Sequence, residues 1–176
     1  MKAKSILKAA LLVTVYLIIT LISVINDNPI IKYQLRCRAP NDEYTEIIET
    51  LNYSDSATFC VDNLRENGAY GFYIPVTEYI YLDDSLKQPE RTIYHEYSHH
   101  LMSLYGLDKA EQYFEYVDEE HITDIIAYLL LEIRGYEVDF NDLSYVTGVD
   151  LEYLEENQAF RDYVSDVVLF EIQAES

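Results

Sequence analysis

Residues 89–106, PERTIYHEYSHHLMSLYG, decide how the rest of this 176-residue chain is interpreted. Proline is tolerated in the first turn of a helix and glycine commonly follows the last turn, so the stretch predicts a helix over 88–105 that ends before Gly106. His95 and His99 are four positions apart and share one face of that helix, where their imidazoles can converge on one point. We therefore expect this helix to carry a metal-binding pair.

The five residues His95 to His99, HEYSH, match the H-E-x-x-H pattern of zinc-dependent proteases. Two neutral imidazoles supply half of a tetrahedral zinc shell. Glu96 lies about 100° further round the helix, close enough to act on a water at the metal without being a ligand. The alternative interpretation is a structural pair of histidines satisfied within the core. The apolar surroundings of the motif predict a helix buried between two layers, which favours the metal site.

A catalytic zinc usually has three protein ligands and one open position, so a third ligand must come from elsewhere in the chain. The segment 118–134 also reads as a helix, and it begins with an acidic cluster that contains one histidine. We favour Glu120 as the ligand, because Asp124 then follows one helical turn later. Glu119 and His121 are its rivals, and the acidic cluster also suits the first turn of a helix in its own right.

The stretch from Glu120 to Ala127, EHITDIIA, resembles the E-x-x-A-D-x-x-A pattern of the gluzincins, the class typified by thermolysin and by small membrane-associated zinc peptidases. The resemblance implies that Glu120 is the third zinc ligand. It also implies that Asp124 hydrogen-bonds the outer nitrogen of a ligating histidine and thereby selects its tautomer. Thr123 departs from the pattern, which usually has alanine at that position.

Upstream of the motif, residues 68–74 and 78–82 are rich in aromatic and β-branched side chains, and the turn-compatible residues 75–77 separate them. We therefore expect two short strands. This order of elements is similar to the gluzincin layout, in which an edge strand pairs with an extended peptide substrate. The resemblance covers about 68–134 and implies a zincin-like α+β fold, with a small antiparallel sheet packed on a helical body.

The resemblance further implies a zinc metallopeptidase that holds one Zn2+ per chain through His95, His99 and Glu120. A zinc-activated water would attack the peptide bond, with Glu96 as the general base that takes its proton and returns it to the leaving amine. Endopeptidase activity is favoured over exopeptidase activity. A tyrosine or a histidine usually stabilises the oxyanion in such sites, and His121 is one of many candidates. The alternative is a non-catalytic, zinc-containing module that is tethered to the membrane and binds peptides or proteins.

The first 40 residues predict a membrane anchor. Three lysines within residues 1–8 precede an uncharged apolar run over 9–26, which is just long enough, at about 1.5 Å per residue, to cross a bilayer. We expect a cytoplasmic tip at 1–8, one N-terminal transmembrane helix at 9–26, a juxtamembrane connector at 27–40 and an extracytoplasmic metallopeptidase domain at 41–176. Secretion after signal cleavage is the alternative, although no small-residue cleavage site follows the apolar run.

Residues 41–176 contain six Lys or Arg against 31 Asp or Glu, a net charge of −25. Nucleic acid is therefore excluded as an expected partner, since phosphate binding needs basic side chains. The negative charge either serves solubility alone or favours neutral or basic peptide or protein substrates, while the N-terminal helix would contact the lipid bilayer.

The remaining expectations concern the cysteines and the flanks of the motif region. Cys37 and Cys60 could form one disulfide, a question that the sequence leaves open. Amphipathic spacing predicts further helices over 42–51, 57–64, 150–157 and 160–172.

Overall fold

The computed structural model describes residues 14, 17, 18, 20, 23, 28–51, 57–137, 145 and 148–173. The chain divides into two compact units, Met1–Cys37 and Arg38–Ser176. In the first unit, helix α2 (Pro29–Arg36) begins at the N-cap Asn28, whose side chain accepts a hydrogen bond from the backbone N–H of Ile31 at 3.2 Å. The segment predicted as a connector therefore contains a short helix.

The predicted transmembrane anchor needs correction. Among the helices formed by the described residues, none combines the length and the apolar character that a bilayer crossing requires. By this criterion the prediction of a transmembrane helix over 9–26 is wrong, and the single-pass localisation that rested on it is withdrawn. Most of residues 9–26 and all of residues 1–8 lie outside the described part of the chain.

The second unit contains a small sheet of three described strands, and the central strand is the last of the three in the sequence. Strand β3 (Tyr79–Asp83) lies between β1 (Thr58–Asp62) and β2 (Gly71–Ile74). β2 pairs with β3 antiparallel through a tight turn, whereas β1 pairs with β3 in parallel. The sheet is therefore mixed and not antiparallel as predicted, because the chain crosses from one edge to the other before it returns to the centre.

Strand β1 also overturns the helix predicted over 57–64. Phe59, Cys60 and Val61 form a continuous apolar run, and such a run is compatible with a buried helix or with a buried strand. Pairing with β3 decides between them, since the partners run in register from Thr58 opposite Tyr79 onward. In addition, Cys60 and Cys37 are both disulfide-bonded, so the described chain has no free cysteine.

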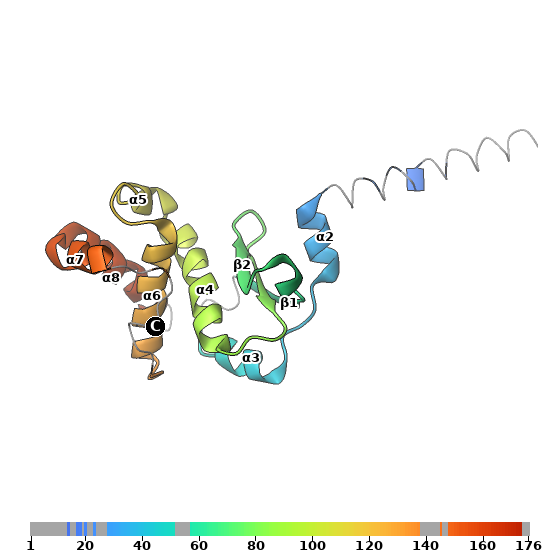
Figure 1. Cartoon of the computed structure of the whole chain (residues 1–176), viewed down its shortest axis with the longest axis horizontal. Helices are drawn as coiled ribbons and strands as arrows, with labels where there is room; N and C mark the ends of the chain where they lie inside the picture. The colour runs from blue at the N-terminus through green and yellow to red at the C-terminus, as the bar shows by residue number, and fades with distance from the viewer. Residues whose placement is uncertain are drawn as a thin grey trace, which may run out of the picture. The chain divides into compact units, whose positions relative to one another are not determined.

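The longest helix that the structure describes occupies the middle of the second unit. Figure 1 shows α4 (Pro89–Tyr105) with the sheet on one side and α6 (Glu119–Ile133) on the other. Helix α3 (Asp42–Ile48) also packs on α4, as does α8 (Gln158–Gln173). The described part of the unit also contains three short helices: η1 (Arg65–Asn67), α5 (Leu107–Glu111) and α7 (Gly148–Glu156).

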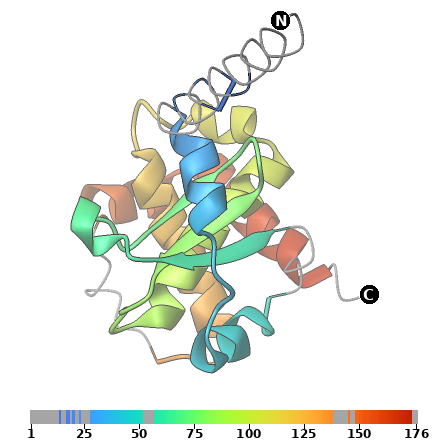
Figure 2. The ribbon, with the colours of Figure 1, turned by 90° about the vertical axis from the view of Figure 1, so that its right-hand side faces the viewer.

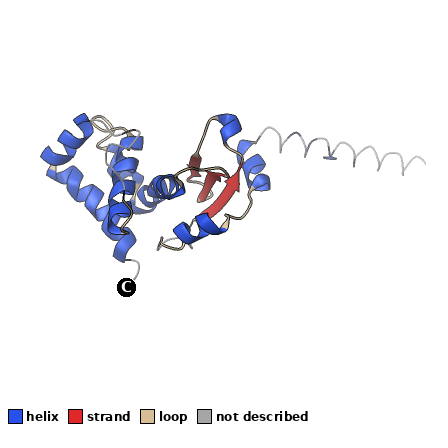
Figure 3. Cartoon of the chain, turned by 60° about the horizontal axis from the view of Figure 1, so that its bottom comes forward, coloured by secondary structure: helices blue, strands red, loops and turns tan. Residues whose placement is uncertain are grey.

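The views from other directions show the same layering of the second unit. In Figure 2 the strands lie in front of α4 and α6. In Figure 3 the strands, drawn in red, are gathered on one side and the C-terminal helices on the other. The described unit is therefore an α+β structure in which the helix with the H-E-x-x-H pattern has a sheet on one flank and helices on the other.

Buried tyrosines connect α4 to its neighbours through their hydroxyl groups. The hydroxyl of Tyr97 donates to Glu171 Oε2 on α8 at 2.9 Å, and Glu171 also lies 3.5 Å from the guanidinium of Arg134. The hydroxyl groups of Tyr94 and Thr50 are 2.7 Å apart and share a hydrogen bond. Each such bond satisfies a polar group that burial removes from water, so these contacts hold α4 in one position.

Candidate metal centre

Helix α4 presents the two histidines of the motif side by side. Pro89 occupies the first helical position, and Gly106 ends the helix with φ at 119°, a region that glycine adopts without strain. Between these ends, His95 and His99 lie one turn apart, with their ring centroids separated by 5.2 Å. Both rings are partly exposed, as ligands of an accessible ion need to be.

Helix α6 places a carboxylate opposite the two imidazoles. Its N-cap residue Asp118 accepts a hydrogen bond from the backbone N–H of Glu120 at 3.1 Å, which positions the first turn. Glu120 Oε2 lies 3.1 Å from His95 Nε2, and Glu120 Oε1 lies 3.5 Å from His99 Nε2. One donor atom from each of the three residues falls within 4.8 Å of the others. Two imidazoles and one carboxylate at this separation fit a divalent zinc-type ion.

The outer nitrogen of each histidine lies beside a carboxylate. Asp124 Oδ1 is 2.7 Å from His95 Nδ1, and Glu119 Oε1 is 3.4 Å from His99 Nδ1. Thr123 Oγ1 is also 3.4 Å from His99 Nδ1, so the residue that departs from the gluzincin pattern contacts a histidine. Contacts of this kind orient the rings and direct the Nε2 atoms inward. Glu119 therefore lies beside the outer nitrogen of His99 and not next to the Nε2 atoms, where a metal ligand would have to lie.

These contacts keep both histidines protonated over a wide pH range in the metal-free protein. Burial lowers the pKa of His95, but hydrogen bonds with Asp124 and Glu120 outweigh that effect and raise it to about 9. Burial also lowers the pKa of His99, and its bonds with Glu119 and Glu120 raise it to about 9 as well. The same bonds hold the pKa of Glu120 well below its usual range. Metal and protons therefore compete for this site.

Glu96 is buried beside the two histidines but does not belong to the cluster of donor atoms. Its side chain rests against Gly71 on strand β2. Burial raises the pKa of Glu96 to about 7, with the positive charges of His95 and His99 partly offsetting the rise. A carboxylate that exchanges a proton near neutral pH is suited to general base catalysis.

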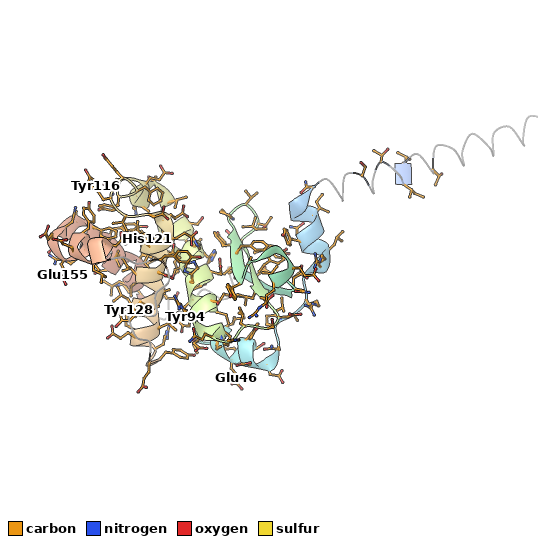
Figure 4. The ribbon with its side chains drawn as sticks, viewed as in Figure 1. Glu46, Tyr94, Tyr116, His121, Tyr128 and Glu155 are labelled. Carbon is orange, nitrogen blue, oxygen red and sulfur yellow. The ribbon has the colours of Figure 1, made fainter. Side chains whose placement is uncertain are left out.

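The other two histidines lie away from the donor atoms. His121 Nδ1 is 2.9 Å from Asp150 on α7, so this residue of α6, labelled in Figure 4, is engaged elsewhere. The structure therefore does not bring His121 to the metal centre, either as a ligand or as an oxyanion donor. His100 is buried, and its Nδ1 lies 3.2 Å from the hydroxyl of Tyr73 on β2.

An open groove of about 1100 Å³ contains the metal centre. One wall comes from residues 68–73 at β2 and another from the first half of α4, while Glu119, Glu120 and Asp124 line its far side. Tyr145 closes that side: its backbone N–H donates to Asp124 Oδ2 at 3.2 Å, and its ring lies 5.7 Å from that of His95. The chain has 18 tyrosines, and no pattern in the sequence distinguishes Tyr145 from the others. Only its position in the folded structure does.

Fold and site together define an α+β protein with a candidate His-His-Glu metal centre between two packed helices. No family model matches the chain, and no curated protein matches it significantly. A solved structure described as the metal-free form of the antirestriction protein ArdC from the R388 plasmid is similar, with 18% identity and a TM-score of 0.51. The match covers 79% of this chain and 50% of that one, so this chain spans about half the length of its structural neighbour.

At this level of identity the likeness shows a shared fold and says nothing about activity. The predicted assignment to thermolysin-like peptidases therefore has no support from family models or from sequence comparison. The comparisons and the structure support two more general statements: the chain shares a fold with ArdC, and His95, His99 and Glu120 form a candidate metal-binding triad.

Proposed function

We propose that this chain is a zinc-dependent hydrolase of peptide bonds. The observation that carries the proposal is the convergence of three ligand-type side chains, His95, His99 and Glu120, in an open groove next to the buried Glu96. A purely structural metal site has no need of a carboxylate of raised pKa that is excluded from the ligand set. Zinc is the ion that imidazole and carboxylate ligands in this number suit best.

Each side chain then has a definite task. When bound, a zinc ion supplies Lewis-acid chemistry, which polarises a carbonyl and makes water more acidic. Glu96 takes the proton of the attacking water and returns it to the amine that leaves. Asp124 and Glu119 hold the rings of His95 and His99 in their ligating orientation.

An extended peptide is the substrate that the groove fits. β2 is an edge strand of the described sheet and forms part of one wall of the groove. Its outer side can pair with an extended chain, which would then run along the free edge of β2 and pass the part of α4 that carries Glu96. We propose internal cleavage, because a chain paired with β2 would present the peptide bonds of its middle to the metal centre.

Tyr145 is the best candidate for the oxyanion donor. Of the three tyrosines that line the groove among the described residues, Tyr73 bonds to His100 and Tyr70 packs under the guanidinium of Arg65. Tyr145 lies next to His95, and burial together with the charge of Glu120 raises the pKa of its hydroxyl, which stays protonated and able to donate. Tyr145→Phe should lower kcat about 100-fold and leave metal affinity unchanged.

A non-catalytic binding module is the second candidate. The structural neighbour is described as an antirestriction protein and not as a peptidase, so its description adds no support for hydrolysis. Such a module would need the metal and the groove but no general base, so it does not explain why Glu96 lies beside the metal ligands.

Hydrolysis of quenched fluorescent peptides by the zinc-loaded full chain tests the proposal. A mixture of random octapeptides should be cleaved, and both a chelator and Glu96→Gln should abolish cleavage. Glu90→Gln is a matched control, since Glu90 lies on α4 outside the groove lining and should leave cleavage intact. A zinc-loaded protein that binds these peptides but cleaves none would leave the binding module as the function.

A further inference from the structure

One aromatic side chain of the groove is much more exposed than the buried tyrosines of the core. Tyr70 directly precedes strand β2, its exposed fraction is 61%, and it lines the groove. The next residue, Gly71, lies against Glu96, and consecutive Cα atoms are about 3.8 Å apart. Tyr70 is therefore placed to contact a peptide close to the proposed general base.

The ring of Tyr70 is held by a guanidinium group. Arg65 Cζ lies 5.3 Å from the centroid of the Tyr70 ring, which is within the range of a cation–π interaction. This contact restricts a side chain that is otherwise open to solvent. Less conformational entropy is then lost when a second group packs against the ring. Tyr70 thus combines high exposure with an ordered position.

Arg65 is in turn fixed by the fully buried carboxylate of Asp83, the last residue of β3. The Nε and backbone N–H groups of Arg65 donate to Asp83 at 3.2 and 2.9 Å. Arg65 Nη2 donates to the carbonyl of Ser85 at 2.9 Å. Ser85 itself donates to Asp83 Oδ1 through its backbone N–H and through its hydroxyl. These contacts leave the guanidinium of Arg65 little freedom to move.

Asp83 also holds the main chain of Tyr70. The backbone N–H of Asp83 donates to the carbonyl of Tyr70 at 2.8 Å. Burial acts to raise the pKa of the Asp83 carboxyl, but hydrogen bonds from Ser85, Arg65 and Leu64 outweigh it and hold that pKa below its usual range. The carboxylate therefore keeps its charge and its hold on Arg65. One buried residue fixes the backbone of Tyr70 directly and the ring of Tyr70 through Arg65.

We propose that Tyr70 packs against an aromatic side chain of the bound peptide, within about two residues of the bond that is cut, and that Arg65 and Asp83 position its ring. Aromatic pairs strengthen an association by about 2–10-fold beyond the effect of the area they bury. A guanidinium beside a tyrosine ring withdraws electron density from it, which favours an electron-rich aromatic partner over an aliphatic one. The inference rests on the proposed peptidase function, because it requires a peptide in the groove.

The experiment measures how fluorescein-labelled hexapeptides bind to the zinc-loaded chain carrying Glu96→Gln. One peptide contains only alanine. Four others carry one phenylalanine in the second, third, fourth or fifth place, and four more carry leucine in the same places. All C-termini are amidated, so the peptides differ in one side chain only. Fluorescence anisotropy should show that at least one phenylalanine peptide binds about fivefold tighter than the alanine peptide, and tighter than its leucine counterpart.

Variants of Tyr70 show whether the gain in affinity comes from this ring. Tyr70→Ala should abolish the gain, and Tyr70→Phe should keep it because the aromatic ring remains. Tyr116→Ala is the matched control, since Tyr116 is 57% exposed but lies outside the groove lining, and it should change nothing. A gain that survives Tyr70→Ala would overturn the inference, as would a leucine peptide that binds as tightly as its phenylalanine counterpart.

Arg65→Gln and Asp83→Asn test the two positioning residues. Each should bring the affinities for the phenylalanine and alanine peptides closer together, while the zinc content and the affinity for the alanine peptide stay the same. A general loss of structure would lower all of these together. In the Tyr70→Ala background neither change should alter the ratio of the two affinities further. An unchanged ratio in both single variants would refute the positioning roles.

These measurements are separate from the test of hydrolysis, because no cleavage is recorded. An aromatic preference that depends on Tyr70, without cleavage by the wild type, would refute only the proposed peptidase. Equal affinity for all the peptides, or no binding of any, would overturn this inference and leave cleavage to be judged by its own assay.

Discussion

Gly71 of β2 lies directly against the side chain of Glu96 in the lining of the groove. A Cβ atom built on Gly71 would lie 2.7 Å from Glu96 Cγ and 2.8 Å from Glu96 Oε1, closer than real Cβ atoms approach other heavy atoms. Glu96 is only 6% exposed, so its side chain has little room to move aside. The absence of a side chain at Gly71 therefore sets where the proposed general base lies.

Gly71→Ala should consequently displace Glu96 and leave the ligands in place. We expect peptide hydrolysis to fall by about 100-fold, since a shift of about 1 Å in a catalytic group has an effect of that size. Zinc affinity should remain unchanged. Gly148→Ala is the matched control, because nothing lies within 4 Å of a Cβ there. Unaltered kcat in Gly71→Ala would show that the position of Glu96 is not critical.

One zinc ion is expected per chain. His95→Ala and His99→Ala should each abolish binding, since either change removes one of three ligands. Glu96→Gln should retain the metal, as should His121→Ala, whose side chain is engaged with Asp150. Elemental analysis after dialysis measures the stoichiometry. Wild-type protein that stays metal-free at micromolar zinc would refute the site as a whole.

Carboxylates around the metal centre should rank by their distance from the ion. Glu120→Gln should weaken zinc binding by more than 100-fold, because it removes a charged ligand. Asp124→Asn and Glu119→Gln disturb only the orientation of an imidazole, so each should cost about 10–100-fold. Competition with a chromophoric chelator measures all three affinities. If Glu119→Gln proved the most damaging of the three, Glu119 and not Glu120 would be the ligand.

Metal affinity should rise with pH up to about 9. Because the pKa values of His95 and His99 are about 9 in the metal-free protein, both rings hold protons at neutral pH that binding must displace. Each displaced proton contributes about tenfold per pH unit below that pKa, so chelator competition at three pH values gives the slope. Asp124→Asn should flatten it. An affinity that stays constant between about pH 6.5 and 8.5 would contradict the protonated state.

The same pKa shifts affect the stability of the metal-free protein in the opposite direction. Both values are raised above 6.5, so protonation of the histidines stabilises the folded chain fully below about pH 6.5. The contribution is lost as the pH rises through about 9. Urea unfolding of the metal-free protein across this window should show the decline, whereas His95→Ala should lose part of it.

The core behind the motif can be tested through two buried tyrosines. Tyr97→Phe removes the hydrogen bond to the buried Glu171 and should lower the free energy of unfolding by about 1.5–3 kcal/mol. The hydroxyl of Tyr163 is buried without a hydrogen-bond partner among the described residues, so Tyr163→Phe should be neutral or stabilising. Urea denaturation compares the two variants. A similar loss in both would mean that the Glu171 contact adds nothing.

Local patterns predicted the helices that carry the metal centre better than they predicted the sheet. Helix α4 and helix α6 lie within one residue of the boundaries expected at both ends, because caps and apolar spacing act over a few residues. Strand β1 was predicted as a helix, because a continuous apolar run shows neither the helical nor the strand periodicity. The strand that decides its conformation, β3, lies about 20 residues further along the chain. The parallel pairing in the sheet depends on that distant contact as well.

The sequence by itself determined that His95 and His99 share one face of a helix with Glu96 next to them, because the helical repeat sets those positions without any distant contact. Only the tertiary structure decided which carboxylate of the acidic cluster points at the imidazoles. The packing of α6 on α4 turns Glu120 inward and brings Glu119 to the outer nitrogen of His99. It also decided that Gly71 adjoins Glu96 and that Tyr70 lines a groove, because both depend on how a strand and a helix from separate parts of the chain pack together.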